Sequence, residues 1–227
     1  MDTCGFPKDT FYYYKAWWGK KPVLHLFPHW NFEGREGDEI PVWVHSNLDE
    51  VELLVNGKSL GRQPVPHLGH VEWKVRYEPG LLEAHGYKDG KLALTEKRET
   101  TGPATALRLT ADRTQIHADG EDLAMIRVEA LDDQGRPVPT ADHLIGFKVS
   151  GAATLIGVGN GDPNCHESDK GDKRSLFNGL AQVIVQAGKQ PGPIDIEATH
   201  PGLSPAQLAI AAIQAESRPA VPDALAS

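Results

Sequence analysis

Residues 51–60 read VELLVNGKSL, and this stretch decides the fold class. Asn56-Gly57 supplies the two residues that most readily take positive φ in a type I′ turn, so the stretch predicts a β-hairpin. Just upstream, the aliphatic residues Ile40, Val42 and Val44 alternate with Pro41, Trp43 and His45. A period of two is typical of a strand with one face in the core.

Strand signals continue on both sides of this hairpin. The run at 24–27 begins the series, residues 71–77 alternate again, and Asp89-Gly90 marks a second hairpin. Pro28 places the first run at a sheet edge or a bulge, because proline lacks a backbone donor. About six strands with frequent turns predict a β-sandwich over residues 21–102.

Thr101-Gly102-Pro103 predicts a hinge, and a second β-rich segment follows it. About seven short strands separated by turns predict another sandwich over residues 103–215. Residues 216–227 contain two prolines and many small residues, so we expect a disordered tail there. The fold class is therefore predicted to be all-β, with two tandem sandwich domains.

The helical signal is confined to the start of the chain. Residues 5–23, GFPKDTFYYYKAWWGKKPV, place Phe11, Tyr14 and Trp18 on one helical face. We expect a helix from about Thr10 to Trp18, with Asp9 as its N-cap and Gly19 as its stop. Further rings fill the other faces, namely those of Tyr12, Tyr13 and Trp17. We therefore expect this helix to be buried on more than one side.

Composition excludes several classes of partner. The net charge is −8, which argues against nucleic acid and anionic membranes, because both attract clustered Lys and Arg. No apolar run approaches the roughly 20 residues that span a bilayer. Met1 is not followed by the basic and apolar segments of a secretory signal. Cys4 and Cys165 form no framework or zinc spacing; we expect two independent thiols, with a bridge as the alternative.

Residues 159–179 form the most polar and turn-rich segment. It contains oxygen ligands that a calcium ion could use: Asn160, Asp162, Glu167, Asp169 and Asp172. Their spacing does not fit an EF-hand. We favour a long loop held by Asx turns, and we expect no metal and no cofactor.

Trp30 and Phe32 follow Pro28 and His29 and have two interpretations. Exposed rings in a loop could stack on a sugar, with Trp43 or Trp73 as further contacts. The same rings could instead close the end of the sandwich or pad a domain interface. We favour the packing role.

Four stretches together resemble a known family. They are CGFPKDTFYYYKAWW (4–18), HLFPHWNFEGREGDEIPVWVHSNLDEVELLVNGKSLG (25–61), ADGEDLAMIRVEALDDQGRPVP (118–139) and GVGNGDPNCHESDKGDKRSLFNGLAQVIVQ (157–186). The first two resemble the C-terminal part of bacterial glycoside hydrolase family 2 enzymes, mostly β-galactosidases. The last two are similar to the family's final immunoglobulin-like domain, of the invasin and intimin type. His29–Gly34 and Asn56–Gly61 are the most specific motifs.

The resemblance implies a non-catalytic C-terminal piece of a retaining β-galactosidase. Residues 1–20 would be the last loop and helix of a TIM barrel, and Cys4, Gly5, Phe6, Lys8 and Asp9 would lie near its rim without a catalytic role. The family's acid/base is a Glu directly after an Asn, and no Asn-Glu pair occurs here. The missing barrel would be the main partner. The family's usual compartment would be the periplasm or the exterior.

Two alternatives stay open on the sequence. The chain could be a carbohydrate-binding module that contacts a saccharide through Trp30 and Phe32. It could also be an immunoglobulin-like spacer or adhesion module without a sugar role. If the chain is a piece without its barrel, we expect the helix to fold back onto the first sandwich, to associate with a second copy through Phe11, Tyr14 and Trp18, or to be disordered.

Overall fold

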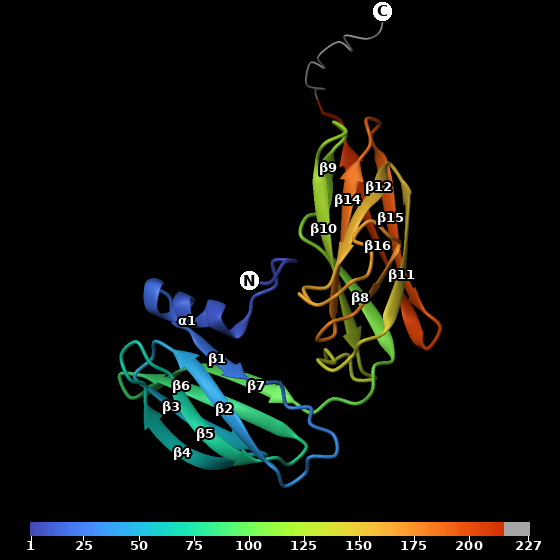
Figure 1. Ribbon diagram of the computed structural model, residues 1–227. Helices are drawn as coiled ribbons and strands as arrows, with labels where there is room; N and C mark the ends of the chain where they lie inside the picture. The colour runs from blue at the N-terminus through green and yellow to red at the C-terminus, as the bar shows by residue number, and fades with distance from the viewer. Residues whose placement is uncertain (216–227) are drawn as a thin grey trace, which may run out of the picture. The chain divides into compact units, whose positions relative to one another are not determined.

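The computed structural model describes residues 1–215, and Figure 1 shows the course of the chain. The chain divides into two compact units, Met1–Thr101 and Gly102–Ser227. The predicted tail at 216–227 lies outside the described residues. No helix in the described part of the chain has the length and apolar character needed to cross a bilayer.

The first unit consists of one helix followed by antiparallel strands. The elements are α1 (Asp9–Trp18), β1 (Leu24–Phe27), β2 (Glu39–Ser46), β3 (Glu50–Val55), β4 (Lys58–Pro64), β5 (Val71–Arg76), β6 (Leu81–Lys88) and β7 (Lys91–Glu99). The strands form two sheets, ordered β1-β2-β5 and β4-β3-β6-β7. Helix α1 lies against β1 and β2 (Figure 1).

Both predicted hairpins of the first unit are confirmed. Asn56 and Gly57 have φ values of 49° and 78° between β3 and β4, and Asp89 and Gly90 have 49° and 73° between β6 and β7. Two consecutive positive φ values match the right-handed twist of the flanking strands. Local turn chemistry therefore sets the register of the second sheet.

The two sheets of the first unit share one apolar core. Alternate residues of facing strands are buried there, including Val42, Val44, Leu53 and Leu82. Leu26 of β1 joins them, so its strand neighbours His25 and Phe27 point to the other face, because strand side chains alternate. That other face is the one on which α1 lies.

The second unit is also built of strands. They are β8 (Ala106–Ala111), β9 (Gln115–His117), β10 (Leu123–Leu131), β11 (Leu144–Gly151), β12 (Ala153–Gly159), β13 (Lys173–Ser175), β14 (Leu180–Ala187), β15 (Gly192–His200) and β16 (Leu203–Ile213). Sequence patterns did not predict β9 and β13, because each has only three residues and lies in a polar segment.

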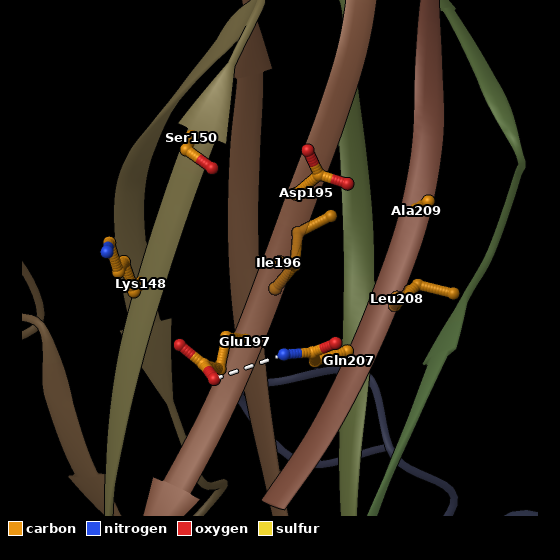
Figure 2. Close-up of a pocket in the computed structure, with 8 residues that line it drawn as sticks. All are labelled: Lys148, Ser150, Asp195, Ile196, Glu197, Gln207, Leu208 and Ala209. Carbon is orange, nitrogen blue, oxygen red and sulfur yellow. Dashed lines mark hydrogen bonds between the residues drawn. The ribbon is translucent and has the colours of Figure 1, made fainter.

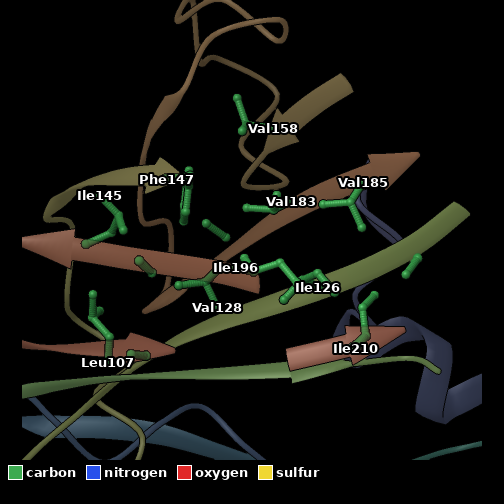
Figure 3. Packing of buried hydrophobic residues seen from close by; sticks show 14 of the residues in the cluster. Leu107, Ile126, Val128, Ile145, Phe147, Val158, Val183, Val185, Ile196 and Ile210 are labelled. Carbon is green, nitrogen blue, oxygen red and sulfur yellow. The ribbon is translucent and has the colours of Figure 1, made fainter. Parts of the chain in front are cut away.

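Two antiparallel sets of strands make up the second unit. One runs β12-β14-β10-β8 and the other β16-β15-β11-β13, with a short parallel pairing of β16 to β8 between them. Residues from both sets meet in one core, shown in Figure 3, where Ile126 and Val183 lie close to Ile196. The predicted all-β class is confirmed. An immunoglobulin topology for each unit stays a prediction.

Candidate functional site

Helix α1 folds back onto the first unit, and its start differs from the prediction. The helix begins at Asp9, and Lys8 is the N-cap residue without a side-chain cap. The expectation that Asp9 caps the helix is therefore wrong. Its carboxylate instead bonds to His25, because that ring lies under the first helical turn. The helix ends at Trp18 as predicted, and the Gly19 N–H bonds to the Lys15 carbonyl.

His25 is the centre of the contact between α1 and the strands. Its Nε2 lies 2.8 Å from Oδ1 of Asp9, and its Nδ1 lies 3.6 Å from Oε1 of Glu96 on β7. Glu96 also accepts a hydrogen bond from the Leu26 N–H and one from Arg98. The imidazole thus joins the helix, the edge strand of one sheet and the edge strand of the other.

Aromatic rings of α1 enclose this contact. Tyr12 stacks on His25 with ring centroids 3.7 Å apart. Tyr13 packs edge-on against His45 of β2, and its hydroxyl donates to the Leu68 carbonyl at 2.7 Å. Trp17 packs edge-on against His67. Three rings of the helix are therefore placed by three histidines of the strand and loop segments below.

The pKa values of the two buried histidines, His25 and His45, are shifted in opposite directions. Burial disfavours charge on His25, but its hydrogen bond to Asp9 and its ion pair with Glu96 outweigh burial and raise its pKa. The bond from His25 lowers the pKa of Asp9. Burial lowers the pKa of His45 to about 4, and the charges of His25 and His70 act in the same direction. One ring therefore favours the charged form and its neighbour the neutral form.

The outer face of α1 is open to solvent. Trp18 is 80% exposed and Tyr14 is 45% exposed, with their ring centroids 4.6 Å apart. Phe11 is half-buried, and Ala16 is the buried residue of the helix. The expectation of burial on more than one side is therefore wrong for this chain. The helix has one docked face and one exposed aromatic face.

The predicted rim residues lie at the start of this helix. Phe6 is half-buried and closes a turn with Asp2, whose carboxylate accepts its N–H at 2.9 Å. Lys8 is exposed at the N-cap, and Asp9 follows it. Cys4 and Cys165 are separate thiols.

Trp30 does not form an exposed platform. Its side chain is 0% exposed, and its indole N–H donates to the Glu78 carbonyl at 3.0 Å. It packs edge-on against Tyr77 and Phe32, and Phe32 is half-buried. The proposed sugar contact through Trp30 is corrected on this point, because a ring inside the core cannot stack on a sugar. The packing interpretation accounts for both residues.

The polar segment at 159–179 is organised around a buried arginine that sequence reasoning missed. Arg174 is 2% exposed, and its guanidinium contacts Asp169, the Cys165 sulfur at 2.9 Å and the Val158 carbonyl at 3.0 Å. Glu167 accepts bonds from the N–H and hydroxyl of Ser175.

Two of the remaining calcium candidates also make side-chain bonds within the loop. Asn160 donates to the Ser175 carbonyl, and Asp162 accepts the Asn164 N–H. The third, Asp172, accepts the Phe147 N–H with its backbone carbonyl. No group of three His, Cys, Asp or Glu side chains in the described part of the chain is arranged to hold a metal ion. These contacts support the interpretation as a loop held by its own polar side chains.

A hollow of about 440 Å³ lies on the outer face of β11, β15 and β16 (Figure 2). Asp195 stands between the smaller side chains of Ser150 and Ala209, and Glu197 accepts a bond from Gln207 at 3.3 Å. Its lining contains no aromatic ring that could stack on a sugar. The hollow has the character of a solvated sheet face.

Residues 107–209 match the model of glycoside hydrolase family 2 C-terminal domain 5, and residues 37–94 match a domain of unknown function, DUF4982. The chain belongs to glycoside hydrolase family 2 and matches the C-terminal region of its enzymes. The resemblance seen in the sequence is thereby confirmed.

Relatives within family 2 extend well beyond this chain. A β-galactosidase of Bacteroides ovatus is 43% identical over 215 residues, which cover 93% of this chain and 25% of that protein. A β-glucuronidase of Formosa agariphila is 36% identical over 207 residues, covering 89% and 21%. A crystal structure of a β-glycosidase from Bacteroides vulgatus matches with a TM-score of 0.89 and 32% identity, covering 92% and 27%. The chain thus spans about a quarter of the length of these relatives.

Proposed function

We propose that this chain is the non-catalytic C-terminal region of a family 2 β-galactosidase and that it buttresses the catalytic barrel through helix α1. The observation that carries the proposal is the two-sided character of this helix. One face is fixed to the first unit through His25, while Tyr14 and Trp18 are exposed. Adjacent exposed rings are typical of a contact surface.

The residues that the relatives have in addition to this region are the proposed partner of the exposed face of α1. About three quarters of each relative lies outside the region that matches this chain. A barrel helix covers a strand of the barrel with its apolar face, so the exposed rings of α1 suit that role. In a TIM barrel the loops before the helices line the active site, which would place Phe6, Lys8 and Asp9 on the rim.

The chemistry of the whole enzyme would come from residues outside this chain. Retaining glycosidases use two carboxylates, one as acid/base and one as nucleophile, and form a glycosyl-enzyme intermediate. No Asn-Glu pair is present here to supply the family's acid/base. A purified preparation of this chain should therefore not hydrolyse an aryl β-galactoside. Clear turnover would overturn the proposal.

The sugar is proposed from the names of the relatives. The relative at 43% identity is a β-galactosidase, and the relative at 36% is a β-glucuronidase. The higher identity favours a β-galactoside. The enzyme encoded by the reading frame that contains this chain should cleave an aryl β-galactoside faster than an aryl β-glucuronide. The reverse preference would reject the galactoside and keep the buttressing role.

The buttressing role has its own test in that longer enzyme. Trp18→Lys places a charge on the exposed face of α1 and should lower the thermal stability and activity of the barrel. Leu92→Lys is the matched control, because Leu92 is an exposed apolar residue of β7. If both substitutions lowered stability and activity equally, the proposal that α1 buttresses the barrel would be wrong.

A further inference from the structure

The docked face of α1 contacts two buried histidines, His25 and His45, whose polar surroundings are opposite. His25 lies between the carboxylates of Asp9 on the helix and Glu96 on β7, and Arg98 pairs with Glu96 on its far side. His45 of β2 is 8% exposed beneath Tyr13 and lies directly opposite His25 in the pairing of β1 with β2. The ring of His70 lies 6.1 Å from that of His45 between centroids.

His45 has no acceptor for a second proton. Its Nδ1 is buried without a hydrogen-bond partner in the described structure. A charged imidazole donates from both nitrogens, so protonation there would leave a buried donor unsatisfied. The surroundings of His25 are the opposite, because carboxylates face both of its nitrogens.

We propose that docking of helix α1 onto the first unit is pH-dependent and strongest near neutral pH, because carboxylates face both nitrogens of His25 whereas the Nδ1 of His45 is buried without an acceptor. The inference concerns the chain itself and does not rest on the proposed function. Loosening of α1 would change how its exposed face is presented to any partner.

At alkaline pH, docking weakens because His25 loses its proton. In the docked state, the bond to Asp9 and the pairing with Glu96 hold the pKa of His25 above the ordinary value of 6.5. Its ion pair therefore contributes fully below 6.5, and the contribution is lost as the pH rises through the raised value. A neutral imidazole still donates one bond to Asp9, so the helix loosens rather than detaches.

The acidic side belongs to His45. Its pKa falls from 6.5 to about 4 in the docked state. Neutral His45 therefore makes its full contribution to the stability of the docked state above pH 6.5. That contribution is lost as the pH falls from 6.5 towards 4. Release of the helix would expose His45 to water and allow it to take up a proton.

Amide hydrogen exchange of the whole chain measures the docking equilibrium directly. Protection factors of the α1 amides would be recorded between about pH 4.5 and about pH 9.5, with the β3 amides of the same unit as internal reference. We expect α1 protection to fall about tenfold relative to β3 towards each limit, since a pKa that differs by about one unit between the docked and released states changes the docking equilibrium about tenfold. Constant relative protection across the range would overturn the inference.

Two substitutions test which histidine causes the fall in protection at alkaline pH and which causes the fall at acidic pH. His25→Gln keeps a donor for Asp9 but cannot ionise, so it should remove the alkaline fall and keep the acidic one. His45→Gln should do the reverse. His117→Gln, an exposed histidine of the second unit, should leave the profile unchanged. An alkaline fall that persists in His25→Gln would reject the role of His25.

A further variant keeps the test decisive if His25→Gln does not fold. Asp9→Asn changes an exposed residue at the start of the helix and removes the charge that pairs with His25. It should likewise flatten the alkaline side. An alkaline fall of wild-type size in Asp9→Asn would contradict the inference.

Discussion

Tyr12 of α1 lies flat on the imidazole of His25, with ring centroids 3.7 Å apart and planes 8° apart. Phe27 stacks on the same imidazole from its own strand, at 5.4 Å and 23°. His25 is therefore enclosed by rings above and beside it while its nitrogens face carboxylates. This one side chain thus contacts the helix both through a stacked ring and through a hydrogen bond to Asp9.

Removal of the Tyr12 ring should loosen the helix. Tyr12→Ala loses the stacked pair and opens His25 to water, and we expect α1 docking to weaken by about 1–2 kcal/mol. The measurement is amide exchange of α1 near neutral pH. Tyr14→Ala is the matched control on the same helix, because its ring is 45% exposed. A larger effect of the control would contradict the assignment of the docked face.

Trp30 should behave as a core residue. Trp30→Ala removes a fully buried ring and its bond to the Glu78 carbonyl, so we expect a loss of about 3–5 kcal/mol in the unfolding free energy of the first unit. Phe32→Ala, which truncates a half-buried ring, should cost less. Urea denaturation followed by Trp fluorescence checks both. An unchanged denaturation midpoint in Trp30→Ala would indicate that the ring is not in the core.

Local chemistry made much of the fold predictable. Asn56-Gly57 and Asp89-Gly90 favour one turn type whatever surrounds them, and Gly19 ends the helix where the apolar period ends. The role of Asp9 was not predictable in this way. A carboxylate at a helix start serves equally as a cap or as a partner for a distant base. The choice depends on His25, which lies on another element.

Burial in the two polar segments could not be read from local sequence either. Trp30 follows a proline and a histidine and resembles a loop residue, yet it lies in the core. Arg174 stands among Asp, Lys and Ser and carried no apolar signal, yet it organises its loop. The hydrogen-bond partner of Trp30 is Glu78, 48 residues further along the chain, so only the tertiary fold brings it near. The partners of Arg174 are Asp169, Cys165 and Val158, which lie within the preceding 16 residues, but their irregular spacing matches no local pattern.

Arg174 should stabilise the second unit. Arg174→Ala leaves the Val158 carbonyl and the Cys165 sulfur without their donor and creates a cavity, so we expect a loss of about 2–3 kcal/mol. Lys170→Ala, on an exposed residue of the same loop, should change the unfolding free energy by less than about 0.5 kcal/mol. Chemical denaturation monitored by far-UV circular dichroism compares them. Equal stability of the two variants would refute the organising role.

The exposed rings of α1 should make the isolated chain self-associate. Trp18 at 80% exposure and Tyr14 at 45% present adjacent apolar surface that water solvates poorly. We expect a concentration-dependent sedimentation coefficient for the purified chain. Trp18→Lys should weaken the association at least about tenfold, since a buried Trp is commonly a dominant contact in an interface. Leu92→Lys, which changes an exposed apolar side chain of β7 in the same unit, should not. A monomer at every concentration would show that these rings need a larger partner surface than a second copy provides.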